Sequence, residues 1–562
     1  MNKKIFFSIL VSLGLLTTFS SCSKKTNKEG RYIPQKAIAV LHINGASINQ
    51  KLPWDEIKNT SLFKRMMEDS TLPAKIKPLL ENPDSSGISI KNNVLLFFMN
   101  DSLGQYAGAE GALVNSDAFE KLVKEDTNGK LNFSESEGMH IGTGNGMALA
   151  WNKERFLFVI GIPKQGNQWG ANNNSFSSKD SMQEPEESVN NNRNYGSLAK
   201  QVFNIKESES LGSDEKFTEL VSDNADLHVW INNEELSSSQ MSEIPSVGPL
   251  NMLNFTKMTK EARATASVHF ENGKIVVDFK NFMNKEVADL LAKNLKSQGD
   301  ADMLKRIPTD NLALLLQFSV NPEIIKGYLK LLGADGFANM GAGMMGFSID
   351  DLIAANAGDF IFSVSNIKAD STFPKADYLF ASAIGSKSEF EKVMAGVTKM
   401  MKVYNSSPTA DSTKEKPKAP FTYNKSEKYF ALGSEQPVVD AFLNGGKSFS
   451  SPIYDKINSG PGGTYINFSY IMGAMSPLAS DSFSHEILDA SKLVWQDMIA
   501  YTEKFNGRSL KGHIDINLVD KNTNSLKQLN RYFDKLGMIY IQKEMEPKPV
   551  QGIATPAATS QY

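Results

Sequence analysis

The stretch Asn92 to Val123, NNVLLFFMNDSLGQYAGAEGALVNSDAFEKLV, holds two apolar runs on either side of a polar turn, followed by the opening of a helix. A second stretch, Gly358 to Met394, repeats this order as GDFIFSVSNIKADSTFPKADYLFASAIGSKSEFEKVM, and a serine precedes Phe-Glu-Lys in both. Two strands that are joined by a short turn form an antiparallel pair, because a connection between parallel strands needs about a dozen residues or more. The sequence therefore predicts the same strand–turn–strand–helix arrangement twice.

Four further pairs of segments recur in the same order. An Ile-Pro turn before an apolar run begins at Ile33 and again at Ile307. WNKERFLFVIG (151–161) matches YNKSEKYFALG (423–433), and this match aligns Asn152 with Asn424. DLHVWINNEEL (226–236) matches GTYINFSYIMG (463–473). The last pair consists of segments 266–295 and 510–536, each of which has the pattern of a hairpin followed by a helix. This order predicts a tandem duplication with halves 32–300 and 301–545, far longer than solenoid repeats of about 20–50 residues. The alternative is that two unrelated domains share a loosely similar order of elements.

Strand and helix patterns within each half predict an α+β fold. Asn272-Gly273 stands between two apolar runs and is a strong hairpin signal. Val287, Leu291 and Leu295 recur on one face of a helix, and that face should pack on a sheet. We therefore expect a mainly antiparallel sheet with packed helices in each of the two sequence-related halves. The predicted helices are Asp117–Glu125, Lys285–Lys296, Glu323–Leu332, Lys387–Val403, Glu486–Phe505 and Ser525–Leu536.

Three segments are predicted to lack fixed structure. Residues 165–194 interrupt the first half and contain too few apolar side chains to offset the entropy of ordering. Residues 405–420, NSSPTADSTKEKPKAP, form a similar insert in the second half, and residues 546–562 form a flexible tail.

The amino-terminal residues have the pattern of an export signal. Lys3 and Lys4 precede an apolar run that is shorter than the roughly 20 residues needed to cross a bilayer. Ser21-Cys22 then resembles the lipobox of bacterial lipoproteins, although Phe19 stands where leucine is usual. We expect residues 1–21 to be a lipoprotein signal peptide, Cys22 to carry acyl chains such as palmitate, and residues 22–31 to be the lipidated tether. The alternative is that Cys22 is incidental and cleavage occurs elsewhere.

Lipid on Cys22 has two consequences. It makes a membrane the first predicted partner, because two or more acyl chains anchor a protein stably without a transmembrane helix. It also consumes the only cysteine of the chain, which excludes a disulfide within the chain, a cysteine nucleophile and a thiolate metal site.

Composition and motifs point to no reaction. Sixty basic and 63 acidic side chains give a net charge of −3. The chain therefore lacks the excess of basic residues that would indicate binding to nucleic acid. The six histidines show no pair at ligand spacing, and no Gly-x-Ser-x-Gly elbow follows a strand. Gly142-Thr-Gly-Asn-Gly146 lacks the spacing of a phosphate-binding loop and indicates a turn. We therefore predict no catalytic residues, no metal site and no cofactor.

A segment rich in glycine and methionine is the one candidate docking patch. Methionine suits adaptable binding surfaces, but it also fills irregular gaps in protein cores. A loose loop and short helix packed against the core is therefore the competing interpretation. The candidate residues of this patch are Phe337, Met340, Met344, Met345 and Phe347.

The lipoprotein start together with the two Ile-Pro openings, at Ile33 and Ile307, resembles an uncharacterised family of large Bacteroidota lipoproteins known only as a domain of unknown function. The resemblance implies a location and an architecture, and it carries no catalytic residues. Lys24 and Lys25 stand where surface-exposed lipoproteins of that phylum have acidic residues, which favours the periplasmic side of the outer membrane over the cell surface.

We therefore expect a membrane-anchored, non-enzymatic binding or scaffold protein of the cell envelope, with an envelope protein as its partner. The alternative is an envelope hydrolase acting on glycan or peptide through carboxylates that meet only in the folded chain. A third alternative, a small-ligand carrier, requires a closed apolar cavity.

Overall fold

The computed structural model describes residues 29–70, 72, 76–126, 130–163, 193–241, 253–309, 311–370, 373–405, 421–446 and 452–545. The predicted signal peptide, Cys22, most of both inserts and the tail therefore lie outside the described residues. The chain divides into two compact units, the first containing Met1–Asn44 and Ser86–Ser239, the second Gly45–Ser85 and Gln240–Tyr562. This division differs from the predicted boundary between residues 300 and 301.

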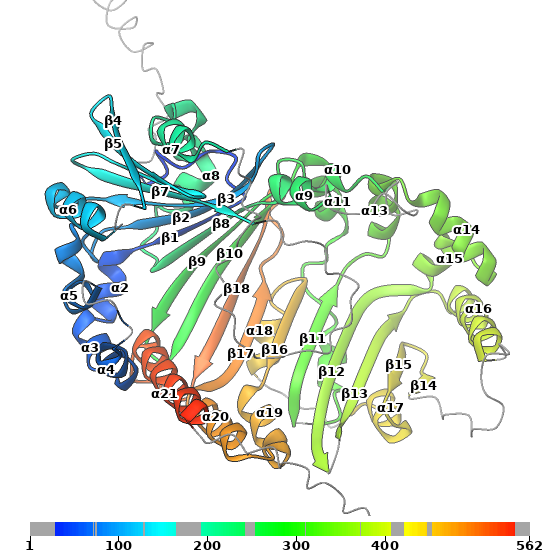
Figure 1. The fold of residues 1–562 in the computed structure, drawn as a ribbon. Coiled ribbons are helices and arrows are strands. Elements are labelled where there is room, and N and C mark those ends of the chain that lie inside the picture. Colours follow the sequence, from blue (N-terminus) through cyan, green and yellow to red (C-terminus); the bar gives the residue numbers. More distant parts are fainter. Residues whose placement is uncertain are drawn as a thin grey trace, which may run out of the picture. The chain divides into compact units, whose positions relative to one another are not determined.

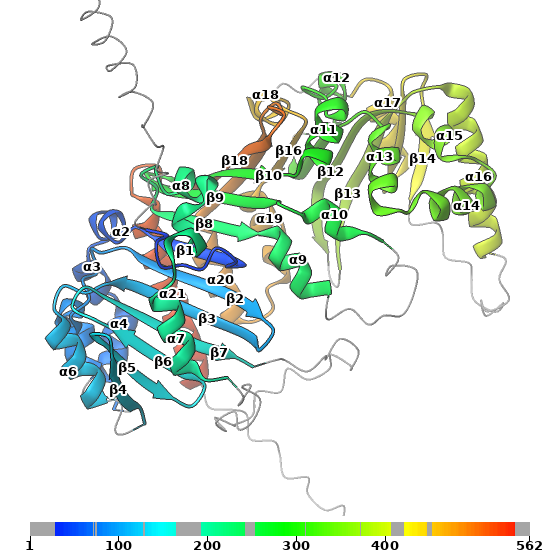
Figure 2. The ribbon, with the colours of Figure 1, turned by 90° about the horizontal axis from the view of Figure 1, so that it is seen from above.

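All 18 strands of the described chain are antiparallel sheet strands, which confirms the α+β class. In the first unit the strands follow the order β8-β1-β2-β3-β7-β6-β5-β4 (Figures 1 and 2). Their bounds are β1 Ala39–Ile43, β2 Val94–Asp101, β3 Gly104–Ala112, β4 Asn132–Ser136, β5 Met139–Gly144, β6 Met147–Trp151, β7 Arg155–Ile162 and β8 Leu227–Asn232.

The core of the first unit lies on one face of this sheet. Along β2 every second side chain is buried, including Leu95 and Phe97, whereas Leu96 between them is exposed. This alternation is the period-2 signature of a strand with one face in the core. Helix α7 packs across β5, β6 and β7 (Figure 2). The other helices of the unit are α6 Ser116–Asp126, α7 Tyr195–Phe203, α8 Glu215–Leu220, α9 Asn233–Met241, which ends beyond the unit, and the 3-10 turns Glu207–Glu209 and Leu211–Ser213.

The last residues assigned to the tether belong to the fold. Gly30 is buried, and Arg31 Nη1 donates a hydrogen bond of 2.7 Å to the carbonyl oxygen of Ile205. Likewise, Arg193 and Asn194 were placed in the first insert, but Arg193 is buried and Asn194 caps α7. Both segments read as unstructured because they are polar, yet hydrogen bonds to partners distant in sequence hold these residues in place.

In the second unit the strands follow the order β9-β10-β18-β17-β16-β11-β12-β13-β15-β14, most of which can be followed in Figure 1. Their bounds are β9 Arg263–Glu271, β10 Lys274–Phe282, β11 Leu312–Ser319, β12 Asn356–Asp370, β13 Phe373–Ile384, β14 Thr422–Lys425, β15 Tyr429–Gly433, β16 Gly462–Ile466, β17 Trp495–Thr502 and β18 Ser509–Leu518. The predicted hairpin at Asn272-Gly273 joins β9 to β10, with Gly273 at a φ of +67°.

Most predicted long helices are confirmed. Asn284 caps α11 by accepting a hydrogen bond of 3.0 Å from the Val287 N–H, and Val287 and Leu291 are buried one turn apart. The longer helices of this unit are α11 Lys285–Asn294, α13 Ile324–Leu332, α14 Asp335–Met345, α16 Lys387–Asn405, α17 Gln436–Leu443, α19 Phe468–Met475, α20 Ser482–Lys492 and α21 Ser525–Met545. The shorter ones are α2 Gly45–Lys51, α3 Trp54–Lys58, α4 Ser61–Glu68, α5 Ile76–Glu81, α10 Phe255–Thr259, α12 Ala301–Lys305, α15 Ile349–Ala354, α18 Pro452–Ile457 and the 3-10 turns Pro83–Ser86 and Ser476–Leu478.

The predicted helix Glu486–Phe505 is wrong in its second half. Helix α20 ends at Lys492, and Trp495–Thr502 forms β17 between β16 and β18. Ile499 is buried in this strand. Pairing with two neighbouring strands outweighs the weak local preference that made the segment read as one helix.

Helix α4 is capped by a residue far along the chain. The Asp534 carboxylate of α21 accepts hydrogen bonds from the Leu62 N–H at 2.6 Å and the Ser61 N–H at 3.1 Å. Lys527 of α21 also forms an ion pair with Glu56 of α3. A carboxylate at a helix amino terminus satisfies free N–H groups and interacts favourably with the helix dipole.

The two units contain the same pattern of strand pairing. In the first, β1 lies between β8 and β2, β3 pairs with β7, and β7 pairs with β6. In the second, β11 lies between β16 and β12, β13 pairs with β15, and β15 pairs with β14.

Candidate functional site

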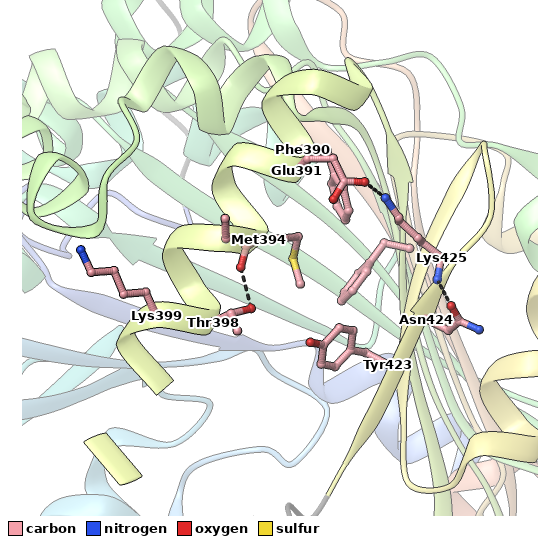
Figure 3. Close-up of a pocket in the computed structure, with 10 residues that line it drawn as sticks. Phe390, Glu391, Met394, Thr398, Lys399, Tyr423, Asn424 and Lys425 are labelled. Atoms are coloured by element: carbon pink, nitrogen blue, oxygen red, sulfur yellow. Dashed lines mark hydrogen bonds and ion pairs between the residues drawn. The ribbon is translucent and has the colours of Figure 1, made fainter. Parts of the chain in front are cut away.

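A groove of about 580 Å³ lies in the second unit between α16 and the β14–β15 hairpin. Figure 3 shows the helix along one side and β14 along the other. The lining residues are Phe390, Glu391, Met394, Ala395, Thr398, Lys399, Tyr423, Asn424, Lys425 and Phe430.

Helix periodicity and strand pairing place these side chains. Phe390, Met394 and Thr398 follow one another at intervals of four residues, which puts them on one face of α16. The Thr398 hydroxyl donates to the Met394 carbonyl oxygen at 2.8 Å, so its polar atom is satisfied within the helix. The ring of Phe430 lies 5.6 Å from that of Phe390 and 6.1 Å from that of Tyr423. The floor of the groove is therefore apolar and aromatic.

Two of the three charged lining residues of the groove are paired with each other. Lys425 forms an ion pair with Glu391 across the groove, as Figure 3 shows, and its ammonium lies 5.7 Å from the ring centre of Phe390. In an adjoining hollow, Lys387 lies 3.3 Å from Glu427. Exposed ion pairs contribute about 0–1 kcal/mol each, so a ligand can displace them at low cost.

The predicted docking patch does not form one surface. Phe337, Met340 and Met344 lie on the exposed side of α14, with 42%, 60% and 82% of their surface accessible. Phe347 is buried and Met345 packs beside it in the cluster that includes Phe390. The residues separate because 337, 340 and 344 share one helix face, whereas Met345 and Phe347 turn inward. A docking role for the exposed three remains a prediction.

The histidines pair with each other and with carboxylates. His42 of β1 and His228 of β8 are opposite one another, with their Nδ1 atoms 2.9 Å apart, so one ring donates and the other accepts. His228 Nε2 lies 2.5 Å from Asp223 and His42 Nε2 lies 3.4 Å from Glu29. The hydrogen bond from His42 lowers the pKa of Glu29, and burial of that carboxyl opposes the shift. The rings are only 3% and 1% exposed, so this cluster joins strands in the core.

A buried carboxyl lies further across the same sheet. Glu110 of β3 is opposite Leu95 and Leu157, and burial raises its pKa to about 8 against the lowering effect of Arg155. The Arg155 guanidinium stacks on Tyr32 and Phe203, and its desolvation lowers its own pKa to about 10, so it remains charged at neutral pH. These groups explain the local electrostatics without forming an open site.

A partly exposed cluster in the second unit contains His513. Its Nδ1 lies 2.5 Å from Asp278 and its Nε2 lies 2.8 Å from Glu503. Burial alone lowers the pKa of His513, but the hydrogen bonds and charges of the two carboxylates outweigh it, and the pKa is raised. His269 approaches Asp278 at 3.9 Å.

Cys22, the predicted lipidation site, lies outside the described residues. Within the described part of the chain no helix is long and apolar enough to cross a bilayer. The same residues hold no group of three or more His, Cys, Asp or Glu side chains arranged for a metal ion.

The groove residues were not singled out from the sequence. The similar segments 151–161 and 423–433 contain several of these residues, but residue identity aligned Asn152 with Asn424. In the structure, Asn152 and Ser426 are the residues that occupy the same place in the two hairpin turns. The alignment by residue identity is therefore shifted by two residues from the alignment in the structure. This shift concealed that Lys425 occupies the position of Trp151.

Residues 30–206 match the family described as "Domain of unknown function (DUF4836)". The expected resemblance to a domain of unknown function is thereby confirmed for this part of the chain, and the lipoprotein and Bacteroidota assignments remain predictions. No curated protein matches the chain.

Solved structures give only distant matches. Crystal form IV of TP0453 is 9% identical with a TM-score of 0.24, and the match covers 46% of this chain and 84% of that one. Crystal form III is 10% identical with a TM-score of 0.25, covering 48% and 87%. A likeness at this level carries no argument about fold or function.

Proposed function

We propose that this chain is a non-enzymatic binding protein of the cell envelope that is held to a membrane by lipid on Cys22 and binds its partner in the groove between α16 and the β14–β15 hairpin. The observation that carries the proposal is the apolar and aromatic floor beside the ion pair of Glu391 and Lys425. Its volume of about 580 Å³ is within the range of ligand sites, which is about 300–1,000 Å³.

The composition of the groove argues against the hydrolase alternative. Glycoside hydrolysis uses two carboxylates, one of which must act as an acid or nucleophile. Glu391 is the only carboxylate among the ten described lining residues, and it is ion-paired with Lys425. The hydroxyl of Thr398 donates to the Met394 carbonyl oxygen, and the ten residues include no histidine that would act as its base.

The open shape of the groove favours a macromolecular partner over a small enclosed ligand. Tyr423 and Lys425 line the groove and yet remain exposed to solvent. A carrier of small apolar ligands would enclose most of the ligand surface. A partner protein that inserts only part of its surface fits an open groove.

The amino-terminal pattern supports the location. Ser21-Cys22 after a short apolar run is the basis for a lipid anchor in a Bacteroidota-type lipoprotein, and the lysines that follow favour the periplasmic face of the outer membrane. Mass spectrometry of the native amino-terminal peptide tests this part. An unmodified Cys22 would contradict it.

We also infer that halves 32–300 and 301–545 arose by duplication. The repeated strand pairing supports this, because β1, β2, β3, β7 and β8 pair as β11, β12, β13, β15 and β16 do, in the same chain order. Two hairpins, β9–β10 and β17–β18, close the halves and pair with each other through β10 and β18.

Photo-crosslinking in intact cells tests binding in the groove. Tyr423 is replaced by a photoreactive phenylalanine analogue, and Leu493, which is exposed at the end of α20, receives the same replacement as a control. We expect an adduct of one discrete mass from position 423 and none from 493. Equal labelling at both positions, or none at 423, would overturn the proposal.

A further inference from the structure

The hairpins β6–β7 and β14–β15 have the same turn. In the first, the Asn152 N–H donates to the Arg155 carbonyl oxygen, and the Asn152 side chain accepts from the Arg155 N–H at 3.0 Å. In the second, Ser426 and Tyr429 make the same two contacts at 2.8 and 3.0 Å. The residues that enter the two turns, Trp151 and Lys425, are therefore equivalent.

The aromatic side chains around the two turns are also equivalent. Phe156 and Phe430 follow the turns and are opposite Trp151 and Lys425 in their ladders. Phe119 of α6 and Phe390 of α16 each lie 5.6 Å, ring to ring, from the phenylalanine that follows the turn. Each unit thus presents two phenylalanines beside the residue that enters its turn.

What fills the space beside these phenylalanines differs. In the first unit the indole of Trp151 fills it: Trp151 is 1% exposed, and its ring lies 6.0 Å from that of Phe119. Strand β5 pairs along the outer edge of β6, and its His140 stacks on Trp151 at 5.3 Å. In the second unit the position carries Lys425, and the groove takes the place of the indole.

In the part of the chain that the structure describes, no strand pairs with the outer edge of β14. Among the described residues β14 pairs only with β15. The Lys425 N–H donates to the side chain of Asn424 at 2.9 Å rather than to a neighbouring strand. Exposed strand edges accept an added strand through backbone hydrogen bonds, and pockets beside them select side chains.

We propose, as an extension that rests on the proposed function, that the occupant of the groove is an extended polypeptide from a partner protein, which adds an antiparallel strand to β14 and inserts an aromatic side chain beside Phe390 and Phe430. The first unit carries both parts of this arrangement within its own chain, as β5 and Trp151. A buried aromatic ring supplies a large apolar area, and the strand supplies register.

The adjoining segment of this chain does not fit as the occupant. Residues 406–420, SSPTADSTKEKPKAP, contain no aromatic residue. They also contain three prolines, which have no backbone N–H for a strand ladder. The adjoining segment therefore cannot supply the aromatic side chain.

Peptide display on the chain from Ser23 onward, which keeps every described residue, tests the inference. Two libraries of random 12-residue peptides are compared, one with tryptophan or phenylalanine at a central position and one with alanine there. We expect enrichment only from the aromatic library. For a selected peptide, replacing the aromatic residue with alanine should weaken binding at least about tenfold. N-methylation of alternate backbone nitrogens should abolish binding in one frame and spare the other, since only every second N–H of a strand faces its neighbour.

Two variants at one position separate filling of the groove from loss of charge. Lys425→Trp places the indole of the first unit in the groove and should weaken peptide binding at least about tenfold. Lys425→Ala removes the same ion pair but leaves the groove open, so it should weaken peptide binding by less than Lys425→Trp does. Lys425→Ala should keep the melting temperature of the wild type, because an exposed ion pair contributes about 0–1 kcal/mol. Lys425→Trp should not lower it, because an indole that fills the groove buries apolar surface.

Several results would overturn the inference: enrichment of peptides without aromatic residues, equal effects of N-methylation in both frames, or unchanged binding by Lys425→Trp. If no peptide binds and position 423 still forms an adduct with a protein, the strand inference fails and the proposed function stands. If neither peptide nor adduct is found, both fail.

Discussion

Glu110 allows the electrostatics of the first unit to be tested by one substitution. Its carboxyl is 5% exposed on β3, and burial raises its pKa from 4.5 in a model compound to about 8. The folded chain therefore keeps a proton that the unfolded chain loses near pH 4.5. Between these values unfolding releases a proton, so the free energy of unfolding falls as pH rises, by about 1.4 kcal/mol per pH unit. Over 3.5 units the loss reaches about 5 kcal/mol.

Glu110→Gln should remove this loss, because glutamine resembles the protonated acid and does not ionise. Relative to the wild type, we expect the variant to gain stability by about 1.4 kcal/mol per pH unit from pH 5 to pH 8. Urea unfolding of the chain from Ser23 onward, followed by tryptophan fluorescence, measures it. Trp151 and Trp230 are buried in the same unit and report its unfolding.

The pH dependence of the difference between variant and wild type decides the outcome. If the glutamine amide itself destabilises the fold, it lowers the free energy of unfolding by the same amount at every pH. The slope of the difference against pH is then unchanged. Glu135→Gln, at an exposed position of β4, serves as the control substitution. If the Glu110→Gln difference is flat between pH 5 and 8, the carboxyl is ionised in the folded chain and the reasoning is wrong.

Three further predictions concern single side chains. Trp151→Ala should lower the free energy of unfolding by about 3–5 kcal/mol, because this side chain is buried. Tyr423→Ala should lower it by less than about 1 kcal/mol, because this side chain faces the groove. Urea unfolding measures both, and equal losses would mean that the groove is not open. His513→Asn should remove a stabilisation that is complete below about pH 6.5 and is lost as pH rises through the raised pKa of His513. The melting temperatures of variant and wild type should therefore differ at pH 5.5 and converge at pH 9. A difference that stays constant with pH would contradict this. Met344→Gln should change stability by less than about 0.5 kcal/mol and Met345→Gln by more, in thermal melts of each single variant; the reverse order would refute the placement of the two side chains.

Strongly periodic segments were predictable from the sequence. The hairpin at Asn272-Gly273 and the helix from Lys285 are set by local signals, namely a turn dipeptide and a helical apolar face. Strand β17 was not predictable, because its residues become a strand only through pairing with β16 and β18. Helices α2 to α5 have only five to eight residues each, fewer than the window of about 11–18 residues over which helical periodicity is recognised.

The candidate site depended on register, which the sequence conveys poorly. Comparing letters matched Trp151 with Tyr423, but the turn hydrogen bonds make Lys425 the equivalent of Trp151. A shift of two residues keeps every side chain on the same face of a strand, so the pattern of apolar residues does not reveal the error. The methionine patch shows the opposite problem: its composition was evident, but the helix separates Met344 from Met345.

The cap that Asp534 provides for α4 sets an order of events during synthesis. Helices α2 to α5 leave the ribosome early, whereas their partner α21 begins about 440 residues later. At roughly 5–20 residues per second this delay is about 20–90 s. Throughout that delay the Ser61 and Leu62 N–H groups lack the carboxylate that accepts their hydrogen bonds in the finished protein. Helix α4 can therefore complete its contacts with α21 only after the last helix has been synthesised.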